Sequence, residues 1–179
     1  MRGWRHILVA IALLWASATW ADRLLEGRVV SVADGDTLTV QDTSGQTHRV
    51  RLVGIDAPER DQPHGLAARD ALAAWVMDRA VRVEHERRDT YRRILGTVYV
   101  GDDNINWRLI REGHAWHAKP FQHEQPVGER WRYAWAQWQA RWDRAGLWQA
   151  DDPVAPWQHR REQRGQGSTR EPAASPGGS

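Results

Sequence analysis

The sequence predicts an α+β fold, mainly β, in which five short strands close into a barrel accompanied by three helices. Five segments are rich in β-branched residues or alternate in polarity, and they cover residues 24–32, 37–41, 47–55, 81–86 and 93–100. Turn signals at Asp34-Gly35 and at residues 42–45 join the first three into a meander. A helical pattern separates the third and fourth segments. This order is typical of a five-stranded OB-fold barrel, and an open α+β sandwich is the alternative.

The first two helices are predicted from apolar spacing and from end signals. Residues 65–78 repeat apolar side chains at helical spacing. A shorter helix begins after Asp103 or Asn104, which are favoured N-cap residues, and it ends at Gly113.

The third predicted helix, from Pro126 to about Ala145, carries four tryptophans on one face. Their spacings of four, three and four bring together Trp131, Trp135, Trp138 and Trp142. An amphipathic helix packed on the barrel has such a face, and so does a platform on which nucleic-acid bases stack. We expect the packed face and keep the platform as the alternative.

Composition indicates one domain with a segment on each side. The 179 residues include no cysteine, which excludes disulfides, cysteine-ligated zinc and thiol nucleophiles. We expect the domain to cover residues 22–150. Residues 151–179 are rich in Gly, Ser, Pro, Arg and Gln, and we expect a disordered C-terminal tail there.

Residues 1–21 have the pattern of a cleavable signal peptide. Arg2 and Arg5 precede an apolar run, and Ala21 offers a cleavage site. The apolar run is shorter than the roughly 20 residues that span a bilayer, so we favour cleavage over a membrane anchor. A periplasmic or secreted protein would result. Loss of the two arginines leaves basic and acidic residues in balance at 23 each, so whole-chain charge does not indicate nucleic-acid binding.

Carboxylates and an arginine gather at the ends of the predicted strands. Asp36 follows the first turn and Asp56 ends the third strand, where both could bind Ca²⁺ or Mg²⁺ through oxygen. Glu59 could orient or deprotonate a water, and Arg51 would face phosphate oxygens. Such a set serves phosphodiester hydrolysis. Asp34 is better explained as a turn former.

Strict alternation places Arg51 and Asp56 on opposite faces of the third strand. Both reach one site only if the strand bulges or ends between them. Gly54 lies at that place, and glycine inside a strand often marks an irregularity.

Three motifs together resemble the staphylococcal (thermonuclease-like) nuclease family over about residues 24–148. They are the runs 34–37 (DGDT), 51–59 (RLVGIDAPE) and 89–93 (DTYRR). The resemblance implies an OB-fold barrel and Ca²⁺-dependent, sugar-nonspecific cleavage of DNA and RNA that leaves 3′-phosphate ends. Mg²⁺ is a candidate substitute. It also implies binding to single-stranded or frayed nucleic acid and no stable protein partner, so we expect a monomer.

The resemblance assigns roles to individual residues. Asp36, Asp56 and the backbone carbonyl of Ala57 match the calcium ligands. Glu59 matches the glutamate usually assigned as the general base.

Two arginines match the family's phosphate-binding pair, and the chain departs from the family beside one of them. Arg51 matches the first, and Arg93 matches the second, which would assist the leaving 5′-oxygen. Arg92 stands where the family usually has glycine, so it is strained if that position needs a positive φ. We favour Arg93 over Arg92 as the phosphate contact.

The family's base-contacting tyrosines have no clear equivalent. Trp116 or Phe121 could stack on a base, and Lys119, the only lysine, could reach a phosphate. For Trp116, packing in the core is the alternative.

Two other functions remain open. One is a catalytically silent OB-fold module that binds nucleic acid. The other is a glycoside hydrolase with Asp56 and Glu59 as its carboxylate pair, although the arginines favour a phosphate substrate.

Overall fold

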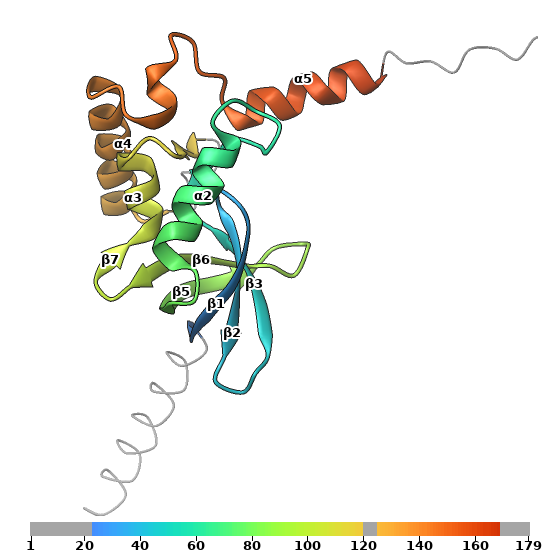
Figure 1. Cartoon of the computed structure of the whole chain (residues 1–179), viewed down its shortest axis with the longest axis vertical. Coiled ribbons are helices and arrows are strands. Elements are labelled where there is room, and N and C mark those ends of the chain that lie inside the picture. Colours follow the sequence, from blue (N-terminus) through green and yellow to red (C-terminus); the bar gives the residue numbers. More distant parts are fainter. Residues whose placement is uncertain (1–22, 120–124, 169–179) are drawn as a thin grey trace, which may run out of the picture.

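The computed structural model describes residues 23–119 and 125–168 and contains a closed five-stranded barrel (Figure 1). Its strands are β1 (Leu24–Asp34), β2 (Thr37–Asp42), β3 (Thr47–Leu52), β5 (Ala80–Arg88) and β6 (Ile94–Val100). Antiparallel pairs join β3 to β2, β2 to β1, β1 to β5 and β5 to β6, and a parallel pair between β6 and β3 closes the ring. The predicted α+β barrel is confirmed, and the open sandwich is excluded.

Eight further elements complete the described part of the fold. They are β4 (Ile55–Asp56), α2 (Gly65–Val76), β7 (Asp103–Asn104), α3 (Ile105–Arg111), β8 (Trp116–His117), α4 (Val127–Trp142), η2 (Gly146–Gln149) and α5 (Pro156–Ser168). Helix α2 separates the third and fourth barrel strands, as predicted. Helix α3 packs against both α2 and α4.

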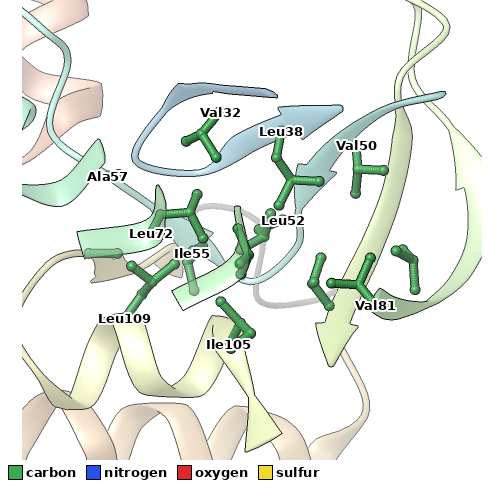
Figure 2. Close-up of a cluster of buried hydrophobic side chains, with 14 of the residues drawn as sticks. Val32, Leu38, Val50, Leu52, Ile55, Ala57, Leu72, Val81, Ile105 and Leu109 are labelled. Atoms are coloured by element: carbon green, nitrogen blue, oxygen red, sulfur yellow. The ribbon is translucent and has the colours of Figure 1, made fainter. Parts of the chain in front are cut away.

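Alternating side chains of the strands fill the barrel interior. Leu38 of β2 and Leu52 of β3 are buried, and Leu72 of α2 and Leu109 of α3 join the same cluster (Figure 2). Val40 of β2 also belongs to this cluster. Each such side chain stabilises the fold by roughly 2 kcal/mol. The two helices therefore share one core with the barrel and fix the loops that begin and end them.

The face of α4 that packs on the protein is not the tryptophan face. The buried residues of this helix are Tyr133, Ala136, Gln137 and Ala140. The four tryptophans are between 51% and 77% exposed, so the expectation that they pack on the barrel is wrong. Both sets recur at helical spacing, and spacing shows which residues share a face but not which face meets the protein.

The C-terminal segment also differs from its prediction. Residues 156–168, expected within a disordered tail, form helix α5, which Pro156 begins. Burial of Ala155 and a ring contact between Trp157 and Trp116 join this segment to the domain. The predicted signal peptide lies outside the described residues. Within the described ranges, no helix is both long and apolar enough to cross a membrane.

A break in the third predicted strand brings Arg51 and Asp56 together. Strand β3 ends at Leu52, and Gly54, with a φ of 73°, turns the chain into β4. A Cβ atom on Gly54 would lie 2.1 Å from Nε2 of Gln125, so a larger residue has no room there. The irregularity predicted at Gly54 is confirmed.

Hydrogen bonds from the buried side-chain amide of Asn106 stabilise this break. Its Nδ2 donates to the carbonyl of Val53 at 2.9 Å and to that of Gly96 at 3.3 Å. Its Oδ1 accepts from the backbone N–H of Val98 at 3.0 Å. Asn106 is fully buried, so water does not replace these partners.

We predict that Asn106→Ala lowers the free energy of unfolding by about 2–4 kcal/mol, because it leaves buried backbone groups without partners. Urea denaturation measures this change. The exposed Gln149→Ala serves as the control and should shift stability by no more than about 0.5 kcal/mol. Equal stability of the two variants would contradict the role of Asn106.

Candidate functional site

The barrel carries a cleft of about 1550 Å³ between the first turn, β4, the loop from β5 to β6, and α5. Its lining includes Asp36, Arg51, Asp56, Glu59 and Arg93. The structure thus brings together all five residues whose side chains the sequence assigned to the metal and the phosphate.

Asp36 is held beside the cleft by three groups. Its Oδ1 accepts from Oγ1 of Thr37 at 3.1 Å, and its Oδ2 accepts from the backbone N–H of Ala57 at 3.0 Å. Arg51 forms an ion pair with the same Oδ2. Only 6% of the residue is exposed. The bond to Ala57 fixes Asp36 against the chain that carries Asp56.

Asp56 is more deeply buried, with 1% exposed. Nη2 of Arg51 donates to its Oδ1 at 3.0 Å, and Nη2 of Arg160 donates to its Oδ2 at 2.6 Å. Burial raises the pKa of Asp56 in spite of the two arginines, and the charge of Asp36 adds to the rise. The carboxylate pair therefore requires positive charge close by.

Arg51 supplies part of that charge. Burial disfavours its charged form, but the carboxylates of Asp36 and Asp56 outweigh burial and raise the pKa of the guanidinium. Strand pairing places Arg51 opposite Thr37, next to Asp36. Arg51 is therefore a permanent cation that joins the ends of β2 and β4.

Asp34 forms the turn before the site. Its Oδ1 accepts from the backbone N–H of Asp36 at 3.1 Å, which agrees with its expected role as a turn former. Burial, together with the charge of Asp36, raises the pKa of Asp34 to about 6.

Glu59 reaches the cleft from the loop before α2. Its backbone N–H donates to Oε1 of Gln62 at 2.9 Å. A Cβ atom on Gly65 would lie 1.9 Å from the carbonyl oxygen of Glu59, so the helix start needs glycine to come this close. The side chain of Glu59 is 40% exposed, and its Oε1 accepts from Nη1 of Arg160 at 2.6 Å.

The loop from β5 to β6 presents Arg93 rather than Arg92 to the cleft. Oδ1 of Asp89 accepts from the backbone N–H groups of Tyr91 and Arg93, each at 2.9 Å, and its Oδ2 accepts from Nε of Arg93 at 2.7 Å. Arg92 is exposed, does not line the cleft and has a φ of 63°. The expected strained backbone at Arg92 is confirmed.

The two aspartates fit a hard divalent cation. Their donors are oxygen atoms, and both carboxylates are buried against cationic groups, so a metal ion would replace charge that the arginines now supply. The described residues contain no cluster of three or more His, Cys, Asp or Glu side chains suited to a metal.

Comparison with known proteins decides the family. Residues 49–150, more than half of the chain, match the model of the family described as "Staphylococcal nuclease homologue". The chain belongs to the staphylococcal nuclease family. The resemblance expected from the sequence motifs is thereby confirmed.

Two relatives in this family cover most of the chain. An Escherichia coli protein named "Uncharacterized endonuclease" is 41% identical over 136 residues, which are 74% of this chain and 83% of that protein. A Shigella flexneri protein named "Micrococcal nuclease" is 36% identical over 170 residues, or 88% of this chain and 91% of that protein.

Sequence reasoning missed Arg160, which comes from α5, beyond the matched range of the nuclease family. Contacts of the neighbouring side chains hold it in place: Nε2 of His159 lies 3.2 Å from Oδ2 of Asp61, and Nε2 of Gln163 donates to the same oxygen at 2.7 Å. Pro156, at the first helical position, was the signal that could have revealed the helix.

The candidates for base and phosphate contacts have different outcomes. Trp116 is 8% exposed and lies in a buried cluster with Trp148, so the idea that it stacks on a base is wrong and the core alternative holds. Lys119 is exposed and stays a candidate for a phosphate contact. Phe121 lies outside the described residues.

We predict that Arg92→Gly raises the free energy of unfolding by about 1 kcal/mol, because it removes a Cβ atom from a left-handed backbone. Arg92→Ala deletes the same side chain but keeps Cβ, so it should leave stability close to wild type. Chemical denaturation of the three proteins compares them. Equal stability of the glycine and alanine variants would show that the backbone is not strained.

Proposed function

We propose that the protein is an exported, Ca²⁺-dependent nuclease that hydrolyses phosphodiester bonds of DNA and RNA. The observation that carries the proposal is the meeting of two buried carboxylates, Glu59 and two arginines in one cleft. The names of the two relatives, an endonuclease and a micrococcal nuclease, support the same chemistry.

Asp36, Asp56 and the backbone carbonyl of Ala57 would hold the metal ion. Bound Ca²⁺ supplies positive charge to the phosphate and lowers the pKa of a bound water. Mg²⁺ is the substitute to be compared with it.

The protein's own side chains perform the rest of the reaction. Glu59 accepts a proton from the water that attacks phosphorus. Arg51 and Arg93 donate hydrogen bonds to the phosphate oxygens as negative charge develops there. The bond from phosphorus to the 5′-oxygen then breaks beside Arg93. The 5′-oxygen leaves with the electron pair of that bond and takes up a proton from solvent, so the phosphate stays on the 3′ end.

Export is part of the proposal and rests on the sequence alone. Removal of residues 1–21 would release a periplasmic or secreted protein that begins at Asp22. We propose that this mature protein acts as a monomer.

We predict that Arg93→Ala lowers kcat/KM by about 100- to 1000-fold on single-stranded DNA in Ca²⁺, because one donor to the developing charge is lost. The measurement is a digestion assay on the mature protein. A chelator should abolish cleavage by the wild type, and added Ca²⁺ should restore it.

Arg92→Ala is the matched control, since it removes the adjacent arginine, which does not line the cleft, and it should keep nearly full activity. An Arg93→Ala protein that cuts at the wild-type rate would refute the role of Arg93. A folded wild type that binds DNA but never cuts it, whichever metal is added, would instead identify a catalytically silent module.

A further inference from the structure

Helix α4 exposes an aromatic stripe that the cleft does not use. It consists of Trp131, Trp135, Trp138 and Trp142, which are 74%, 58%, 51% and 77% exposed. At 100° per residue the four side chains lie within about 60° of arc around the helix. Four exposed indoles on one face form a larger apolar patch than monomeric proteins usually leave in water, which points to a binding surface.

The indoles are arranged as a partial stack. Trp135 and Trp138 have ring centroids 4.7 Å apart at an interplanar angle of 18°, and Trp138 and Trp142 are 5.8 Å apart at 21°. Trp138 therefore stacks on both of these neighbours. Trp131, before the stack, and Trp142, at its end, are the most exposed members and offer ring faces to a flat ligand.

The packing of α4 fixes the direction of the stripe. Tyr133, Ala136 and Ala140, on the opposite face of the helix, are completely buried. The helix lies at the edge of the fold beside α3 (Figure 1). The tryptophans are thus presented to solvent on a rigid support, and no ordering of a loop is needed before a ligand binds.

Positive charge borders the stripe. Arg132 lies over the ring of Trp107 at 5.5 Å, and Arg141 lies over the ring of Trp148 at 4.2 Å. Both are exposed. Of the acidic residues near the C-terminal end of the stripe, Asp143 is paired with Arg111, and Asp151, which lines a hollow with Arg141, is paired with Arg144. The arginines on both borders of the stripe favour an anionic partner.

We infer that this face of α4 is a second binding surface for single-stranded nucleic acid, separate from the cleft. Unpaired bases stack on Trp131 and Trp142, and Arg132 and Arg141 meet the phosphates. From Trp131 to Trp142 the helix rises about 16 Å, which matches roughly four to five stacked nucleotides. The inference rests on the proposed function because that function identifies the polymer as nucleic acid. It does not require that the cleft cleaves this polymer.

Two other partners fit the surface less well. A second copy of the chain would bring the positive charges of Arg132 and Arg141 toward the same charges of its partner. An anionic membrane would satisfy the charge, but it does not require indoles aligned in parallel.

The test measures the affinity of the full mature protein for a labelled 30-nucleotide single strand, by fluorescence anisotropy with a chelator present. Trp131→Leu/Trp142→Leu keeps apolar bulk but removes the aromatic faces, and it should weaken binding roughly 30-fold, the effect of two lost stacking contacts. Trp131→Phe/Trp142→Phe keeps aromatic faces and should stay within about threefold of the wild type. Binding of duplex DNA should not change.

The exposed Leu66→Ala on α2 is the control for loss of a surface side chain elsewhere. Equal affinity of the leucine variant and the wild type would overturn the inference. A wild type that is dimeric or that binds anionic vesicles would also overturn the inference if Trp131→Leu/Trp142→Leu leaves its affinity for DNA unchanged.

Cleavage of a dinucleotide, which is too short to span both surfaces, separates this inference from the proposed function. The leucine variant should cleave it at the wild-type rate. A wild type that cleaves nothing but shows tryptophan-dependent binding would refute the nuclease and leave the surface standing.

Discussion

The site depends on the burial of two carboxylates side by side. Asp36 and Asp56 are almost excluded from water, and two desolvated anions repel each other unless cations lie close by. Arg51 contacts both and makes their burial tolerable. The break of the strand at Gly54 follows from this requirement, since without it Arg51 and Asp56 would point to opposite faces. Asn106 then holds the break in place.

The sequence predicted those parts of the fold that local chemistry determines. Turn residues and alternation located the five barrel strands, and the helix between the third and fourth strands fixed the topology. Strict alternation would place Arg51 and Asp56 on opposite faces of the strand, and this conflict identified the break at Gly54. Arg92 stands where the family usually has glycine, and this difference identified a strained loop. In each case the cause lies within a few residues of its effect.

Long-range packing decided the parts that the sequence did not predict. Helix α4 has two faces with helical spacing, and contact with α3, β8 and η2 selects the one that contains Tyr133 and two alanines. Helix α5 looked disordered because its composition is polar, but its charged and amide side chains find partners about a hundred residues earlier in the chain. Arg160 reaches Asp56 and Glu59 in this way. No pattern near Arg160 reveals those partners.

We propose that the buried carboxylate pair is a cation site whose charge Arg51 and Arg160 now balance. Calorimetric titration with Ca²⁺ tests it most directly, on the wild type, Asp56→Asn and Arg160→Gln. We expect one bound Ca²⁺ in the wild type and none in Asp56→Asn. Binding should be roughly tenfold tighter in Arg160→Gln, where a competing cation has been removed. Equal binding by wild type and Asp56→Asn, or no binding by a folded wild type, would contradict the proposal.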